Sequence, residues 1–291
     1  MRRLLTLLTL TLLMVQFTFA QNGEARSAEA GKAYNDGLNF AKKQKYDAAV
    51  KEFKKAIAAD DNFPGANYML GYCYKKLNNM SNAEKYYKAT IDLDSKFEKA
   101  YVALGNLYAQ ADRKSEAINT YTAVLAINTN NPKANFGLGK VHFDKKEYTK
   151  AIPYLQKAVE VHKKYVLAYT VLALSYQNVS RYDDAVAAFE TAISFEKKRN
   201  KKGKLYYQLG ETCVQAKKLK KAEDALLNAV KMSTNSTIKA GSNFYLGEVY
   251  KMTGRKTKAL LHYGKAAKNR RWKASADYQI DLLKNPDKYV D

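Results

Sequence analysis

The stretch YVALGNLY, residues 101–108, carries a pattern that recurs through most of the chain. Its glycine has a small counterpart at every 34th residue, and these positions are Gly37, Gly71, Gly105, Gly139 and Ala173. Twelve residues after each small residue stands an alanine, and four residues later a large apolar or aromatic side chain. Two insertions of three residues follow, after which the same order returns around Gly210 and Gly247. A period of this length indicates tandem supersecondary units.

The apolar residues inside a unit have helical spacing. Ala117, Ile118, Tyr121 and Val124 follow the i, i+1, i+4, i+7 order of one helix face. Two such helices fit into 34 residues if short polar turns join them. We expect the small residues where the two helices cross, because small side chains allow close approach. One such pair cannot bury its own apolar face, so neighbouring pairs must stack.

The order of an aromatic residue, Leu-Gly, tyrosine, then alanine and a second aromatic residue resembles the tetratricopeptide repeat (TPR). The resemblance implies an all-α fold, a right-handed superhelical solenoid of about seven helix-turn-helix units plus a C-terminal capping helix. The expected units are residues 30–63, 64–97, 98–131, 132–165, 166–199, 203–236 and 240–273. We expect residues 272–291 to form the capping helix and tail, and residues 197–202 and 234–239 to lengthen two loops between units.

The first twenty residues have the pattern of a secretory signal peptide. Arg2 and Arg3 precede an apolar run that ends near Ala20. A membrane-anchoring helix is the alternative, but the run is shorter than the roughly 20 residues that span a bilayer. We therefore expect residues 1–20 to be removed and residues 21–29 to form a short lead. This predicts an exported protein, soluble after cleavage, in the periplasm or cell envelope of a bacterium.

The composition offers little material for catalysis. Two cysteines and three histidines leave no ligand cluster, and no Gly-rich phosphate loop or nucleophile motif occurs. We expect no enzyme activity, no cofactor and no metal site. His142 replaces a repeat tyrosine and is predicted to be packed and hydrogen-bonded, whereas His162 and His262 are expected on helix ends or outer faces. Cys73 and Cys213 are predicted to be buried free thiols.

The resemblance also implies a concave groove, lined by the first helix of each unit, that receives an extended peptide or a helix of another protein. Aromatic residues with interleaved lysines suit a partner that has acidic and apolar side chains. The alternative is that the tyrosines are core spacers and the lysines are solvated. The expected groove residues are Tyr68, Tyr72, Lys75, Lys76, Lys99, Asn106, Gln110, Lys133, Phe136 and Lys140.

The charge of the chain is uneven. The formal net charge is +22, and residues 197–273 contain 21 basic and four acidic residues. Such a field steers acidic partners, so a scaffold docked on anionic lipid or glycan is the first alternative function. Nucleic acid binding is a weaker alternative, because lysine dominates where arginine would favour bidentate phosphate contacts. A solvated basic face is the simplest interpretation. The expected basic patch is Arg255, Lys256, Lys258, Lys265, Lys268, Arg270, Arg271 and Lys273.

Overall fold

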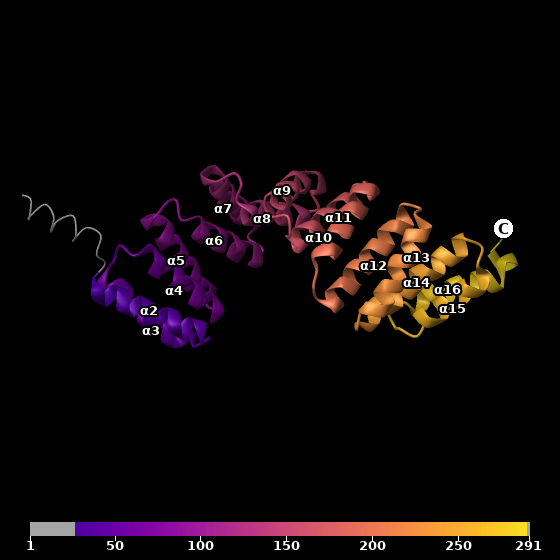
Figure 1. Cartoon of the computed structure of the whole chain (residues 1–291), viewed down its shortest axis with the longest axis horizontal. Helices are drawn as coiled ribbons and strands as arrows, with labels where there is room; N and C mark the ends of the chain where they lie inside the picture. Colours follow the sequence, from indigo (N-terminus) through magenta and orange to yellow (C-terminus); the bar gives the residue numbers. More distant parts are fainter. Residues whose placement is uncertain (1–26, 290–291) are drawn as a thin grey trace, which may run out of the picture. The chain divides into compact units, whose positions relative to one another are not determined.

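A computed structural model describes residues 27–289, and within that range the chain is helical with no strand (Figure 1). The predicted signal peptide lies outside the described residues. The first helices of the pairs are α2 (Ala28–Lys42), α4 (Pro64–Lys76), α6 (Glu98–Gln110), α8 (Pro132–Asp144), α10 (Val166–Asn178), α12 (Arg199–Gln215) and α14 (Ser236–Met252). The second helices are α3 (Tyr46–Ala59), α5 (Met80–Leu93), α7 (Lys114–Ile127), α9 (Tyr148–Val161), α11 (Tyr182–Phe195), α13 (Leu219–Met232) and α15 (Lys256–Ala266). Helix α16 (Lys273–Lys284) and the short 3₁₀ helix η1 (Pro286–Tyr289) follow.

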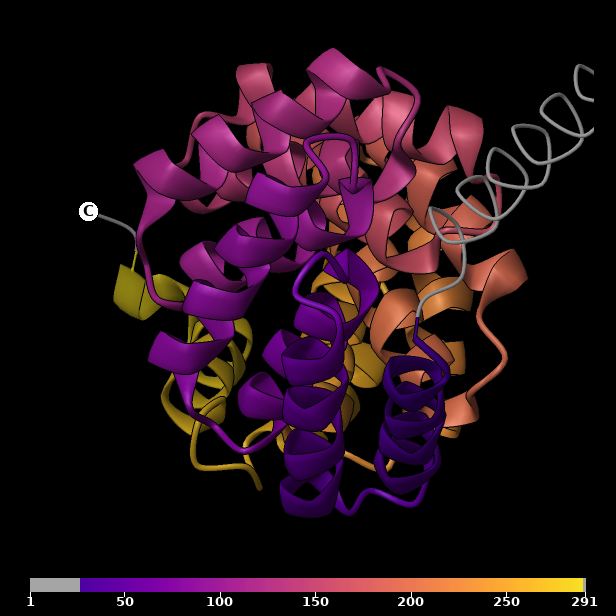
Figure 2. The same ribbon diagram turned by 90° about the vertical axis from the view of Figure 1, so that its left-hand side faces the viewer.

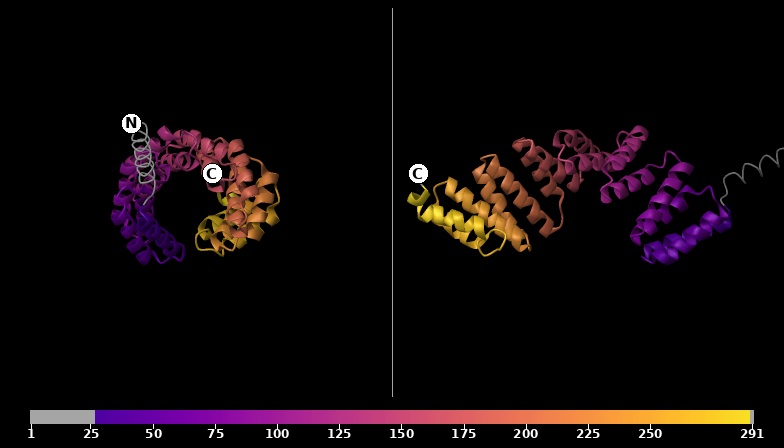
Figure 3. Two further views of the ribbon diagram at one scale, coloured as in Figure 1. Left: turned by 60° about the vertical axis from the view of Figure 1, so that its left-hand side comes forward. Right: turned by 180° about the vertical axis from the view of Figure 1, so that it is seen from behind.

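The helices pack as consecutive pairs, which confirms the predicted all-α architecture. The chain divides into two units, residues 1–128 and 129–291. In the first unit α2 packs on α3 (Figure 2), α4 on α5 and α6 on α7, and α3 also contacts α4 and α5 contacts α6. In the second unit the pairs from α8–α9 to α14–α15 repeat this arrangement, and α16 packs on α15 (Figure 3).

A residue with left-handed backbone conformation follows the end of the first helix in every pair. The residues with positive φ are Gln44, Asn78, Asp112, Lys146, Ser180, Lys217 and Gly254. In the third pair, the Arg113 N–H, just after this residue, donates to the Tyr108 carbonyl at 2.9 Å. This hydrogen bond is characteristic of a Schellman ending, which reverses the chain in few residues. The polar turns predicted between paired helices are therefore present.

The small residues lie at the helix crossings, as the sequence predicts. A Cβ on Gly105 would lie 2.7 Å from the Tyr121 ring, and one on Gly71 would lie 2.8 Å from Tyr87. Both tyrosines are buried. The glycine therefore leaves the space that the large side chain of the facing helix fills.

Replacement of a crossing glycine tests this contact. We expect Gly105→Ala to lower the free energy of unfolding by about 1–3 kcal/mol, because overpacking displaces the Tyr121 ring. The measurement is urea unfolding followed by circular dichroism. The matched control is Gly264→Ala in α15, where an added Cβ meets nothing within 4 Å and should stabilise by roughly 0.5–1 kcal/mol. Equal effects at the two positions would contradict the crossing model.

The three-residue insertions lengthen helices rather than loops, so that part of the sequence prediction was wrong. Helices α12 and α14 each have 17 residues, whereas α6 has 13. The added turn of α12 is held by the end of α13, because Arg199 donates to the Lys231 carbonyl at 3.0 Å. The Asn235 side chain caps α14 by accepting from the Ile238 N–H at 3.0 Å.

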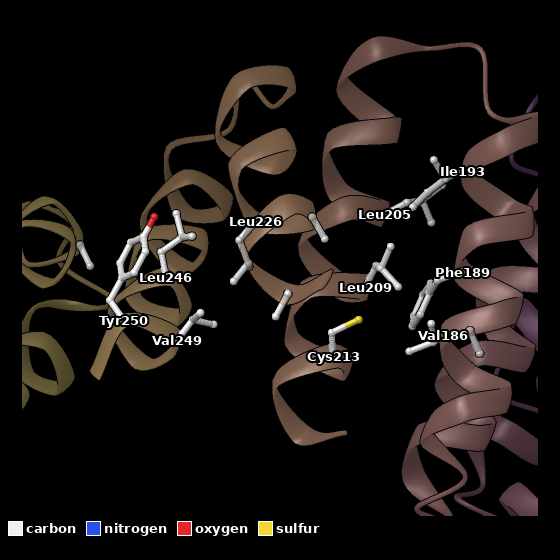
Figure 4. Close-up of a cluster of buried hydrophobic side chains, with 14 of the residues drawn as sticks. Val186, Phe189, Ile193, Leu205, Leu209, Cys213, Leu226, Leu246, Val249 and Tyr250 are labelled. Atoms are coloured by element: carbon white, nitrogen blue, oxygen red, sulfur yellow. The ribbon is translucent and has the colours of Figure 1, made fainter. Parts of the chain in front are cut away.

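Helix α16 covers the last pair, as predicted. Ala276 is fully buried, and Ile280 and Leu283 pack against the same hydrophobic cluster. This cluster continues through the second unit to Phe189 of α11 and Leu209 of α12 (Figure 4). Cys73 and Cys213 are buried free thiols, as expected, and burial raises the pKa of each to about 11.

Loss of the capping helix should expose apolar surface. We expect a chain that ends at Lys268 to be insoluble, because the side chains beneath α16 lose their cover. The comparison is a chain that ends at Lys284, which removes η1 alone and should stay soluble. Soluble protein fraction after expression and centrifugation is the measurement. A soluble, cooperatively unfolding chain that ends at Lys268 would count against the capping role.

Candidate functional site

The predicted groove residues occupy one stripe of the first helices α4, α6 and α8. Relative to the small residue of the repeat, they lie six and three residues before it and one, four and five residues after it. We call this stripe the first-helix face. None of the ten predicted residues is buried, so all of them reach solvent. The two units each carry part of this set and are described in turn.

In the first unit the face is aromatic. The Tyr68 ring lies 5.8 Å from Tyr87 and 5.4 Å from Phe97, between centroids. The Tyr72 ring meets Tyr46 edge-on at 6.4 Å. Burial raises the pKa of Tyr68. These tyrosines therefore pack on neighbouring rings and still present surface to solvent.

Two lysines stand beside these rings. The Lys76 ammonium lies 5.4 Å from the Tyr72 centroid. Burial, followed by the charge of Lys76, lowers the pKa of Lys75. Neither lysine forms an ion pair with a carboxylate among residues 27–289. The pair is therefore a partly desolvated positive charge without an internal counter-ion.

Helix α6 adds exposed polar side chains to the first unit. Lys99, Asn106 and Gln110 are all exposed. The Tyr121 hydroxyl donates to Asn106 Oδ1 at 2.8 Å. The tyrosine that fills the crossing thus also orients a side chain of the first-helix face.

The three predicted groove residues of the second unit have different surroundings. Lys133 is exposed, and Phe136 packs on Tyr165 with ring centroids 5.0 Å apart. The Lys140 ammonium bonds to Asp144 Oδ1 at 2.6 Å, one turn along its own helix. The charge of Lys140 is therefore neutralised within the chain.

The structure contains a pair of inter-repeat clamps that the sequence analysis missed. In the first unit, Arg113 bonds to Glu84 of the preceding pair at 2.6 Å and stacks on the Tyr108 ring at 4.3 Å. The Tyr108 hydroxyl also donates to Glu84, at 3.0 Å. The Arg113 hydrogen bond, with support from Lys88 and Tyr108, lowers the pKa of Glu84 to about 2. The sequence feature that these clamps share is a tyrosine followed five residues later by an arginine.

The second clamp uses Arg255, so this member of the predicted basic patch is paired within the chain. Arg255 bonds to Glu223 at 2.7 Å and stacks on Tyr250 at 4.5 Å. Lys273 is also engaged, because it bonds to Asp277 at 2.6 Å. Lys258 lies 5.6 Å from the Tyr250 centroid. The exposed members without an ion pair in the described chain are Lys256, Lys258, Lys265, Lys268, Arg270 and Arg271.

The three histidines differ in their burial and in their hydrogen-bond partners. His142 is packed as predicted, with Nδ1 2.7 Å from Glu147 Oε2 and its ring stacked on Tyr154. The exposed His162 ends α9, also as predicted. His262 corrects the expectation of an outer face, since it is half-buried and its Nδ1 lies 2.9 Å from Asn243 Oδ1. Burial, with the charge of Lys265, lowers the pKa of His262 to about 4.

Neither a metal-ligand group nor a membrane-spanning helix is found among the described residues. No group of three or more His, Cys, Asp or Glu side chains within residues 27–289 could hold a metal ion. In the same range no helix has the length and apolar character needed to cross a membrane.

Comparison with protein families identifies the repeat. The family described as Tetratricopeptide repeat matches residues 34–96 and 170–237. The family described as Anaphase-promoting complex, cyclosome, subunit 3, matches residues 113–192. The chain is a tetratricopeptide-repeat protein. Members of this family are typically non-enzymatic scaffolds for protein interaction. No curated protein matches the chain.

Solved structures of other proteins share the fold. The crystal structure of MamA protein is 28% identical, with a TM-score of 0.51, and the match covers 59% of this chain and 94% of that one. The C-terminal part of a TPR repeat-containing protein from Cytophaga hutchinsonii is 16% identical, with a TM-score of 0.68 and coverage of 85% and 99%. YrrB, described as a TPR protein with an unusual peptide-binding site, is 22% identical, with a TM-score of 0.55 and coverage of 64% and 94%.

The Glu84 clamp makes a pH-dependent contribution to stability. Because its folded pKa lies below the ordinary value of 4.5, Glu84 stabilises the fold above about pH 5 and loses this effect as pH falls toward 2. We expect Glu84→Gln to lower the free energy of unfolding by about 1–2 kcal/mol at pH 7. Urea unfolding at several pH values is the measurement.

The matched control for this clamp is Glu160→Gln, which alters an exposed ion pair with Lys157 and should cost less than about 0.5 kcal/mol. The difference between wild type and Glu84→Gln should shrink steadily below pH 4. A difference that stays constant between pH 7 and pH 3 would contradict the ionic role of Glu84.

Proposed function

We propose that this TPR protein is an exported, non-enzymatic scaffold that binds a segment of another protein in a groove formed by its first helices. The observation that carries this proposal is the cluster of Tyr72, Lys75 and Lys76. There an aromatic surface and two unpaired lysines reach solvent on one helix. A half-buried charge without a counter-ion is costly, and an acidic group of a partner would supply the counter-ion.

The chemistry of the partner follows from these residues. The rings of Tyr68 and Tyr72 offer apolar contact area at a low cost in conformational entropy. The lysines favour glutamate or aspartate beside the apolar side chains of the partner. The unusual peptide-binding site of YrrB supports the proposal as a property of another protein with the same fold.

Export rests on the sequence of residues 1–20 alone. The basic start, the apolar run and the small residue at Ala20 support cleavage and passage into the periplasm or cell envelope of a bacterium. The partner would then be an envelope protein.

A double truncation of aromatic side chains tests the groove. We expect Tyr72→Ala with Phe136→Ala to weaken capture of the native envelope partner by at least about tenfold, because each side chain is an aromatic contact. The measurement is quantitative affinity capture by the mature chain. The control is Leu261→Ala, which truncates a side chain 56% exposed on α15. Undiminished capture by the double variant would refute the groove.

A second candidate function is supported by the exposed, unpaired cations near the C-terminus. In this alternative, Lys268, Arg270 and Arg271 dock the protein on anionic lipid or glycan. Arg270→Glu with Arg271→Glu should then reduce binding to vesicles of anionic phospholipid, and binding should weaken steeply as salt increases. Unchanged vesicle binding would exclude this alternative. The same salt series with nucleic acid as the probe tests the third and weakest candidate.

A further inference from the structure

Two acidic residues lie on the first-helix face of the second unit, in its most basic part. Glu211 of α12 follows the small residue Gly210, and Glu248 of α14 follows Gly247. They occupy the position that Tyr72 and Asn106 hold in the first unit. Between residues 197 and 273 there are 21 basic and only four acidic residues. Half of these acidic residues are therefore on this face.

Aromatic side chains pack around Tyr245, whose hydroxyl bonds to one of the two carboxylates. The rings of Tyr207 and Tyr245 lie 6.1 Å apart, and those of Phe244 and Trp272 lie 5.0 Å apart. Tyr245 also lies 6.0 Å from Trp272. Trp272 packs directly on Gly241, where an added Cβ would meet the indole at 2.8 Å. These contacts join α12, α14 and the start of α16 in one aromatic surface.

Tyrosine hydroxyls hold both carboxylates in place. The Tyr245 hydroxyl donates to Glu211 Oε1 at 2.7 Å, and the Tyr263 hydroxyl donates to Glu248 Oε1 at 2.5 Å. The charges of both glutamates act on Tyr245 and contribute to the rise in its pKa, after burial. Each carboxylate is therefore oriented by a phenol, and Tyr245, which bonds to Glu211, lies one turn before Glu248 on α14.

Neither carboxylate has a cationic partner within the described chain. Glu223, which lies in the same basic region, is paired with Arg255 at 2.7 Å. Glu211 and Glu248 are half-buried and form no ion pair among residues 27–289, despite the excess of lysine and arginine around them. Arg271 acts electrostatically on Tyr207 and bonds to neither glutamate. The site thus has two partly desolvated negative charges and no internal counter-ion.

We propose that this face binds a lysine or arginine side chain of the partner segment, flanked by an apolar residue. The carboxylates supply charge-assisted acceptors, and the aromatic rings supply both a cation–π surface and an apolar contact. The surrounding positive field is screened within about 10 Å, so a basic segment is accepted only where it can contact Glu211 and Glu248. This inference rests on the proposed groove function and extends it, because the first-helix face carries Lys75 and Lys76 in the first unit but carboxylates in this part of the second unit.

The single tryptophan of the chain provides a local measurement. Trp272 forms part of the site, so its fluorescence reports binding there. The probes are two synthetic peptides of equal length that alternate leucine and serine with either lysine or glutamate. We expect the lysine peptide to shift Trp272 emission in a saturable manner. Its affinity, measured from this emission, should be at least about tenfold higher than that of the glutamate peptide measured in the same way.

Matched variants separate charge from structure. Glu248→Asn keeps an acceptor for Tyr263, as Asn106 does for Tyr121, and Glu211→Gln keeps one for Tyr245. Together they should weaken the lysine peptide about tenfold or more. Asp224→Asn makes an equal charge change on the exposed side of α13 and should leave affinity within about twofold.

The results distinguish this inference from the groove itself. Equal responses to the two peptides, no Trp272 response to the lysine peptide, or full affinity in the double variant would each overturn it. The comparison of the two peptides uses the wild-type chain, so it remains a test of the inference even if the double variant does not fold. If the Tyr72 and Phe136 truncations abolish partner capture while the lysine peptide leaves Trp272 unchanged, the groove function stands and this inference fails.

Discussion

The contact between a small residue and a large side chain at each helix crossing determines how the rest of the chain is arranged. Where Gly105 faces Tyr121, the ring enters the space that a Cβ would occupy, and the two helices can approach closely. Neighbouring pairs bury the remaining apolar surface. The hydroxyl of the same tyrosine donates to the exposed Asn106, so this residue links the core to the exposed face.

Internal ion pairs determine which charges are left for a partner. The two clamps use Glu84 with Arg113 and Glu223 with Arg255 to join successive helical pairs. Lys140 is likewise occupied by Asp144. Charges without such a partner are present on the first-helix face, with lysines beside tyrosines in the first unit and glutamates beside aromatic rings in the second. Net charge alone predicts an acidic partner for the whole array, whereas the side-chain contacts predict a partner of mixed charge.

The repeat period predicted the helices well because the spacing of glycine, alanine and aromatic residues follows directly from the helix crossings. It did not predict that the insertions near residues 200 and 236 would extend α12 and α14, since this depends on a hydrogen bond that Arg199 donates and one that Asn235 accepts. The exposure of Tyr72 and Lys76 was predicted from their positions relative to the small residue of the repeat. The pairing of Arg255 and the burial of His262 were not, because both depend on side chains from a neighbouring helix.

One helical pair cannot fold alone, and stacking on its neighbours supplies its missing core. Far-ultraviolet circular dichroism of a peptide that spans residues 98–131 tests this most directly, in comparison with the first unit, residues 27–128. We expect the isolated pair to be mostly unfolded in buffer and to show no cooperative thermal transition, whereas the three-pair unit should be helical and melt cooperatively. A cooperative, helical transition in the isolated pair would contradict this view of the fold.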